Sequence, residues 1–193
     1  MIPRRPGSHT PTPRLPQAWS LAANTTGVNS SRWQSDVDLL NRGAAAAKVD
    51  LALLKANQAN PDPLVAAIDV PAGETVRIAN VLGTLLPAGN AGLGVRFCTG
   101  EAFVNSRFYN TGSAGGKVYG MYVPSRAHDR GVTPCRSGVF HHLSYSRDTA
   151  VGHRTNIGAT NATATPTTWV ITLFGDTGAV VGTQTSTLAA FEH

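Results

Sequence analysis

The sequence predicts an all-β protein: an antiparallel Greek-key β-sandwich that is internally duplicated, with an incomplete second copy. Short segments of alternating apolar and polar residues recur along the 193 residues, and 20 glycines and 12 prolines punctuate them. No segment keeps a helical period over many residues. The layout of residues 33–54 also returns at residues 153–174, after a constant shift of 120 positions (153 − 33 = 120). Packing antiparallel sheets face to face explains the alternation, because every second side chain then enters the core.

The composition is that of a folded domain with an uncharged polar surface. Apolar residues make up 41% of the chain, which is sufficient for a core, and charged residues make up only 14%. The polar surface must therefore come mostly from Thr, Ser, Asn and Gln, as in many extracellular β proteins. The net charge is +5, part of which comes from Arg4, Arg5 and Arg14 near the start. No dense block of Lys and Arg with interleaved aromatics is present, so nucleic-acid binding is not favoured.

The order of the expected elements follows from the alternation. Strands are predicted at residues 18–23, 36–41, 48–55, 64–70 and 75–79. The stretch VLGTLL at residues 81–86 lacks alternation and is expected to form a single helical turn. Later strands are predicted at residues 94–98, 102–109, 117–123, 140–143, 155–159, 169–174 and 180–187. Turns are expected at PAG (71–73), PAGN (87–90) and GDTGAVVG (175–182), because Gly and Asp accept the positive φ of tight turns.

The repeat places similar residues at corresponding positions. Asp36 corresponds to Asn156, and Asn41 corresponds to Asn161. An alternating strand follows each asparagine after a run of small residues, and its inward side chains are Val49, Leu51 and Leu53 in the first copy and Trp169, Ile171 and Leu173 in the second. We therefore expect the two stretches to occupy equivalent places in the fold, with the same faces buried.

Three regions are expected along the chain. Residues 1–16 contain five prolines and are predicted to be a disordered or extended arm. Residues 17–150 are predicted to be the first β-sandwich unit, and residues 151–193 a partial second copy that packs on the first in one contiguous core. The last strand, at residues 180–187, is expected at a sheet edge, where it is a candidate for pairing with further sequence or with a partner chain.

The amino-terminal residues and the hydropathy of the chain bear on its location. Residues 1–16 begin with arginines, but prolines stand where a secretory signal has its apolar stretch, so no signal peptide is visible in this chain. No run reaches the roughly 18 apolar residues that a membrane helix needs. The two cysteines, Cys98 and Cys135, allow one disulfide in an oxidising compartment, where they are expected to lie close enough to bridge; two free thiols are the alternative.

Four motifs, in order, resemble a known protein family. They are RWQSDVDLLN (32–41), SRFYN (106–110), GKVYGMYVP (116–124) and HRTNIGATN (153–161). Their order and spacing resemble a repeated module of bacterial multidomain extracellular proteins with the motif pair W-R-T-D-x-x-x-x-N and F-R-T-N-x-G-x-x-N. The resemblance spans about residues 19–188. The first copy departs from the pattern, because Gln34 and Ser35 replace the Arg-Thr pair.

The resemblance implies an immunoglobulin-like β-sandwich outside the cell or at its surface, without an established catalytic role. The motif residues would then be structural, and they are Asp36, Asn41, Arg107, Asn110, Arg154, Asn156 and Asn161. For Arg107 and Arg154, the residues themselves favour the same role, since a guanidinium fork can tie strands or loops together across a sandwich.

Several residue patterns could form catalytic or metal sites, and each has a structural alternative. Asp36 and Asp38 point to one face of a strand and could ligate a hard cation such as Ca²⁺, but no Gly-containing acidic loop accompanies them. The adjacent His141 and His142 point to opposite faces of a strand, and no spacing demands a zinc site. A triad of Ser144, His142 and Asp148 lacks a nucleophile elbow and an oxyanion loop. We therefore predict no enzyme, no metal and no cofactor.

Two functions from different classes remain. The first is a structural spacer or adhesion module, whose partners would be neighbouring domains or another copy by strand pairing. The second is a carbohydrate-binding module that stacks exposed aromatics on a cell-surface glycan. A row of exposed coplanar aromatics would favour the second, although Trp33 and Trp169 are expected in the core.

Overall fold

The computed structural model describes residues 17–27, 30–112, 119–133, 135–148 and 155–193. The predicted arm at residues 1–16 lies outside these residues. The described chain is almost entirely β, as the sequence predicted, and all strand pairs are antiparallel. The strands are β1 (Ala18–Thr26), β2 (Arg32–Leu40), β3 (Ala47–Lys55), β4 (Leu64–Val70), β5 (Thr75–Ile78), β6 (Asn90–Thr99), β7 (Phe103–Asn110), β8 (Tyr119–Pro124), β9 (Arg126–Ala127), β10 (Thr167–Phe174) and β11 (Val180–Leu188). One helical turn, α1 (Val81–Thr84), and one 3₁₀ turn, His128–Arg130, complete the described elements.

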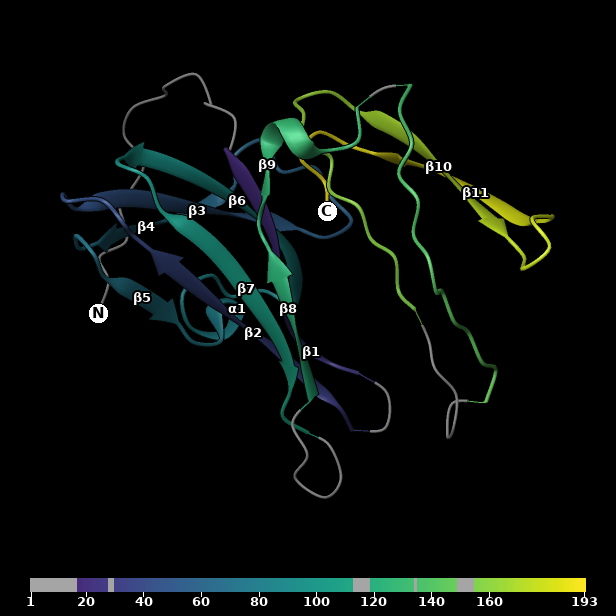
Figure 1. Cartoon of the computed structure of the whole chain (residues 1–193), viewed down its shortest axis with the longest axis horizontal. Coiled ribbons are helices and arrows are strands. Elements are labelled where there is room, and N and C mark those ends of the chain that lie inside the picture. The colour runs from purple at the N-terminus through teal and green to yellow at the C-terminus, as the bar shows by residue number, and fades with distance from the viewer. Residues whose placement is uncertain (1–16, 28–29, 113–118, 134, 149–154) are drawn as a thin grey trace.

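The first nine strands form a connected sandwich-like body (Figure 1). Their order is β4-β3-β6-β1-β2-β7-β8, with β5 on β2 and β9 on β1. β1 joins the two halves, because residues 18–23 pair with β6 and residues 24–26 pair with β2. The opposite edge of β2 is paired with β7 along residues 33–40. The chain therefore passes from one sheet region to the other within β1.

The core lies between these two sheet regions. On β3, Val49, Leu51 and Leu53 are buried, whereas Lys48 is exposed, so the predicted alternation is confirmed. Because β4 and β6 flank β3, their apolar side chains share this face. The cluster comprises Ala18, Ala22, Val37, Leu39, Val49, Leu51, Leu53, Ile68, Val70, Ile78, Val81, Leu82, Leu86, Ala91, Leu93, Val95, Ala102 and Val104. The helical turn predicted from VLGTLL supplies three of these residues and closes one end of the core.

β10 and β11 form a separate two-stranded sheet joined by the predicted tight turn (Figure 1). The turn carries Gly178 at φ 81°, and the Gly175 amide donates to the Ala179 carbonyl. No side chain of this hairpin belongs to the core cluster of the body. The expectation of one contiguous core is therefore wrong for β10: Trp169 and Ile171 are only half-buried, and Leu173 is 44% exposed.

Two predicted strands, one at the end of the expected first unit and one at the start of the expected second copy, are not regular strands. Residues 140–143 and 155–159 are irregular, with His142 at φ 58°, and they lie on the hairpin's side of the body in Figure 1. A strand is stable only when its backbone groups find a neighbour. Beside these segments, Thr155 and Ser144 share two hydrogen bonds: the Thr155 amide donates to the Ser144 carbonyl at 2.9 Å, and the Ser144 amide donates to the Thr155 hydroxyl at 3.1 Å.

Candidate functional site

The repeated asparagines hold the turns that follow them. Asn41 is buried, and its carboxamide nitrogen donates to the carbonyl oxygen of Ala45 at 2.8 Å. The same nitrogen lies 3.0 Å from the Val70 carbonyl and 3.1 Å from the Pro71 carbonyl, at the end of β4. Its side-chain oxygen accepts from the Gly43 amide at 2.8 Å. One side chain therefore ties the end of β2 to the start of β3 and to the end of β4.

Asn161 makes the corresponding set of bonds. Its nitrogen donates to the Thr165 carbonyl at 2.8 Å and the Ala189 carbonyl at 2.8 Å, and it lies 3.4 Å from the Leu188 carbonyl. Its oxygen accepts from the Thr163 amide at 3.0 Å. Both asparagines thus bind the carbonyl four residues on and the amide two residues on. Both also bind two successive carbonyls at the end of a hairpin's second strand, β4 or β11.

The backbone around the two asparagines also corresponds. The Asn41 amide donates to the Glu74 carbonyl at 3.0 Å, and the Asn161 amide donates to the Glu192 carbonyl at 2.8 Å. Both glutamates close a turn with a 3.2 Å bond to the carbonyl three residues before them. In these turns Gly73 has φ 72° and Phe191 has φ 53°, so both occupy the left-handed region.

A further pair of hydroxyl side chains corresponds near the start of the repeat. The Ser35 hydroxyl accepts from the Ala23 amide at 2.8 Å, and the Thr155 hydroxyl accepts from the Ser144 amide at 3.1 Å. Ser35 and Thr155 are separated by the same shift as the asparagines (155 − 35 = 120). Residues 138–146 therefore stand next to residue 155 much as β1 stands next to β2.

The correspondence ends at Asp36 and Asn156. Asp36 is buried and accepts from the Arg107 guanidinium at 3.0 Å, the Tyr109 hydroxyl at 2.9 Å and the Asn80 amide at 3.0 Å. Asn156 is exposed, and its side chain has no hydrogen bond among the described residues. The partners of Asp36 come from β7 and from the start of α1, and the second copy has no counterpart of these elements in the described chain.

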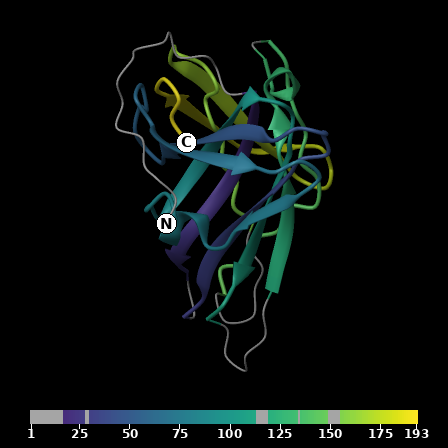
Figure 2. The ribbon, with the colours of Figure 1, turned by 90° about the vertical axis from the view of Figure 1, so that its left-hand side faces the viewer.

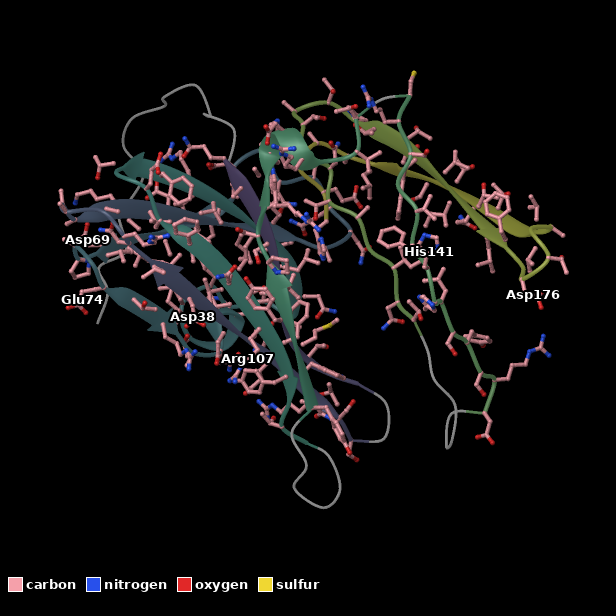
Figure 3. The ribbon with its side chains drawn as sticks, viewed as in Figure 1. Asp38, Asp69, Glu74, Arg107, His141 and Asp176 are labelled. Atoms are coloured by element: carbon pink, nitrogen blue, oxygen red, sulfur yellow. The ribbon has the colours of Figure 1, made fainter. Side chains whose placement is uncertain are left out.

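Arg107 and Tyr109 make this aspartate a structural anchor. The Arg107 guanidinium carbon lies 4.7 Å from the centre of the Tyr109 ring, so that ring is partly covered. Burial and the hydrogen bond to Asp36 raise the pKa of Tyr109. Arg107 and Asp38 are labelled in Figure 3, on the neighbouring strands β7 and β2. Arg107 of β7 thus binds Asp36 of β2, which is the contact that the predicted strand-tying role requires. Arg154 lies outside the described residues.

Asn110, the last residue of β7, binds the first residue of β2. Its side-chain oxygen accepts from the Arg32 amide at 2.9 Å and from the Gly112 amide at 2.9 Å. Asn110 is buried, so these bonds satisfy an oxygen that water does not reach.

The Asp36–Asp38 pair does not leave its carboxylates open for a cation. Asp38 accepts from Arg77 at 2.7 Å and 3.1 Å, and Asp36 is occupied by Arg107. Among the described residues, no three His, Cys, Asp or Glu side chains gather as metal ligands. His141 and His142 have ring centres 6.4 Å apart on the exposed segment, and Figure 3 labels His141 there. No hydrogen bond joins His142 to the Ser144 hydroxyl in the described chain.

The two cysteines are free and exposed, so the disulfide that the sequence allowed is not formed. Cys98 lines a hollow of about 370 Å³ with Gln17, Phe97 and residues 99–103. Its thiol lies 3.2 Å from the Asp50 carboxylate, which also binds Arg96. Partial burial and the hydrogen bond to Asp50 raise the pKa of the Cys98 thiol. A thiol held in its protonated form is a poor nucleophile, so this arrangement does not activate Cys98.

A junction joins the hairpin to the body, and sequence reasoning did not predict it. The Asn57 amide donates to the His193 carbonyl at 2.9 Å, and the Asn60 amide donates to the Ala190 carbonyl at 3.0 Å. The buried Asn60 side chain adds a bond to the Phe191 carbonyl at 2.8 Å. Both Figures 1 and 2 place the carboxyl terminus beside the end of β3. Asn60 carried only a weak signal, namely an asparagine in the turn sequence NQANP.

Exposed apolar side chains concentrate in the later part of the chain. Of the 17 large apolar side chains that are exposed in the described residues, 14 come after residue 118. They include Val139, Phe140 and Leu143 on the extended segment, and Val170, Leu173, Phe174, Val180 and Val181 on the hairpin. Large exposed apolar surfaces mark interaction sites more often than ordinary surface. The candidate site therefore comprises residues 138–146 and the hairpin β10–β11, which carry most of these exposed side chains.

Comparison with known proteins identifies no family for this chain. No family model matches the chain, and no curated protein matches it. In the part of the chain that the structure describes, no helix has the length and apolar character to cross a membrane. A solved structure described as the crystal structure of Thermotoga maritima 1070 is similar over 58% of this chain and 95% of that chain, with 11% identity and a TM-score of 0.42.

Proposed function

We propose that this chain is a non-catalytic β-sandwich module with a structural role, as a spacer or an adhesion domain outside the cell. In fold terms, we propose an immunoglobulin-like Greek-key sandwich followed by an incomplete second copy that arose by internal duplication. The shared bonding of Asn41 and Asn161 carries the proposal, because two unrelated hairpins have no reason to share it. The motif resemblance supports the same assignment. Tandem units of this kind extend a chain over distance.

The use of the charged side chains supports a structural role. The carboxylates of Asp36, Asp38 and Asp50 are each bound by an arginine. Acid–base catalysis needs a titratable group that faces substrate and whose pKa is near the working pH. In this chain the paired carboxylates instead link neighbouring strands, as Arg107 links β7 to β2.

Location is the property that tests the proposed role most simply. An antibody raised against the purified chain should label intact cells of the organism that encodes it, without permeabilisation. External protease should remove that signal, while a cytoplasmic marker protein stays intact. Labelling that requires permeabilisation would contradict the proposal.

A carbohydrate-binding module is the second candidate, and the observation behind it is the exposure of two tyrosines on β8. Tyr119 is 57% exposed and Tyr122 is 62% exposed on this strand. They lie three residues apart and therefore point to opposite faces, so they do not make a row. The nearby Tyr109 ring is partly covered by Arg107. A glycan array separates the candidates: saturable binding that Tyr122→Ala removes and Tyr122→Phe keeps would favour the carbohydrate module.

A further inference from the structure

Strand β10 lacks a neighbour that its counterpart has. In the first unit, β3 is paired with β4 on one edge and with β6 on the other. The asparagine bonds and the register match β10 with β3 and β11 with β4, because Ala47 faces Val70 and Thr167 faces Leu188. Within the described ranges, however, β10 is paired with β11 alone. The other edge of β10 therefore presents backbone amides and carbonyls that no strand of the described residues pairs with.

The counterpart of β1 lacks the same neighbour. β6 pairs with β1 as well as with β3, so it lies between them. Residues 138–146 correspond to β1 by the shift of 120 (18 + 120 = 138). Their contact with Thr155 is of the same kind as that of β1 with Ser35, but it is made by Ser144, one residue after the counterpart of Ala23 (23 + 120 = 143). Within the described residues, this segment has no strand pairing like that of β1 with β6. In the first unit β6 lies between β1 and β3. Among the described residues, no strand lies between the segments of the second unit that correspond to β1 and β3, namely residues 138–146 and β10.

We propose that the second unit binds an extended peptide strand in the place that β6 has in the first unit, antiparallel to β10. The inference rests on the duplication proposed above and not on the spacer or adhesion role. Addition of a strand to an open sheet edge supplies main-chain hydrogen bonds, and alternate side chains give specificity. In the first unit this strand places Leu93 opposite Leu53 and Val95 opposite Leu51. The ligand should therefore carry apolar residues opposite Leu173 and Ile171.

The charge of the ligand strand follows from one further difference between β3 and β10. Asp50 on β3 lies opposite Arg96 on β6, and the two side chains form an ion pair. By the same shift Asp50 corresponds to Val170, which is 60% exposed (50 + 120 = 170). An arginine opposite Val170 would have no carboxylate with which to form an ion pair. The proposed ligand is therefore an uncharged, apolar-alternating strand, unlike β6 itself at this position.

Two peptides test the proposal against the full chain. Both have the sequence of residues 90–99 with Cys98→Ser, and one also has Arg96→Val. We expect saturable binding of both to the wild-type chain, with the Arg96→Val peptide about fivefold tighter, because the arginine has no partner there. In a Val170→Asp chain the order should reverse, and Val170→Thr should keep the wild-type order. Hydrogen exchange should locate the bound peptide by protecting alternate amides of β10.

The outcomes separate the inference from the proposals on which it stands. No binding, or binding without protection of β10, overturns the strand proposal. Equal affinities of the two peptides for the Val170→Asp chain would show non-specific apolar adhesion and also overturn it. Protection of β10 that rises with chain concentration in the absence of peptide would show that a second copy occupies the edge, and would contradict the proposed ligand. None of these results bears on the hydrogen bonds of Asn41 and Asn161, so each of them leaves the proposed duplication standing.

Discussion

Asn41 and Asn161 lie 120 residues apart (161 − 41 = 120), and each donates a 2.8 Å hydrogen bond to the carbonyl four residues on. Each also holds the last carbonyls of the following hairpin. The surroundings of the two hairpins differ, because β3 is flanked on both edges and β10 on one in the described chain. Because the two asparagines make the same local hydrogen bonds in different surroundings, substitutions at matched positions of the two hairpins can be compared directly.

The first prediction concerns the two asparagines. Asn41→Ala should lower the free energy of unfolding by about 1–3 kcal/mol, because it removes the donor that binds the buried carbonyl of Val70 and the carbonyls of two turns. Asn161→Ala removes the same bonds outside the main core. It should leave the main unfolding transition nearly unchanged while speeding hydrogen exchange in β10 and β11. Urea unfolding and hydrogen exchange of both variants provide the check, and equal losses of global stability would contradict it.

The second prediction compares apolar side chains at matched positions. Leu51 is fully buried, and Leu51→Ala should cost about 2–5 kcal/mol because it opens a cavity. Ile171, its counterpart on β10, is half-buried outside the core cluster, so Ile171→Ala should cost less than about 1 kcal/mol. Thermal and urea unfolding measure both. A large loss for Ile171→Ala would mean that the hairpin shares the core of the body.

The third prediction concerns the thiol of Cys98. Burial and the bond to Asp50 raise its pKa, so the folded chain holds less thiolate at pH 8 than the unfolded chain does. Iodoacetamide should therefore modify Cys98 more slowly in the native chain than in the chain unfolded by about 8 M urea. Peptide mass spectrometry resolves the site. Faster native alkylation, or a Cys98–Cys135 bridge in the oxidised native chain, would refute this prediction.

The fourth prediction is a pH dependence of the junction. Burial lowers the pKa of His193, whose ring nitrogen lies 2.8 Å from the Thr160 hydroxyl. A lowered pKa favours the neutral ring in the folded chain, so the stabilisation is present above pH 6.5 and is lost as pH falls through the lowered pKa. An NMR titration should place the midpoint of His193 below 6.5, and the amides of Asn57 and Asn60 should shift with the same midpoint. Their shifts should lose this midpoint in His193→Gln. A midpoint at or above 6.5 would contradict the burial of this ring.

The sequence predicted the elements of the body well because local patterns determine them. The alternation of Val49, Leu51 and Leu53 revealed a buried strand face, and the loss of alternation in VLGTLL revealed the helical turn. Asn41 and Asn161 were identified by the repeat and by the motifs that end in them. Their bonds to the ends of β4 and β11 could not be predicted, since these depend on tertiary approach.

The failures arose where a segment depends on neighbours. Residues 140–143 have a strand-like pattern, but regular structure also needs a paired edge, which the described chain does not supply. Trp169 looked like a core residue by alternation, yet it lies on a sheet outside the body's core. Asn60 was missed because its role depends on the approach of Ala190 and Phe191, over 100 residues away in sequence.

The central claim is that the two asparagine-centred turns are copies of one structural unit, and NMR couplings across hydrogen bonds test it most directly. The account predicts a measurable coupling from the Asn41 amide nitrogen to the Glu74 carbonyl carbon. It predicts a second one from the Asn161 amide nitrogen to the Glu192 carbonyl carbon, because both amides donate to those oxygens. Both couplings should be present in the same sample of the native chain. A coupling at Asn41 with none at Asn161, in a sample whose β10–β11 amides are assigned and folded, would contradict the claim.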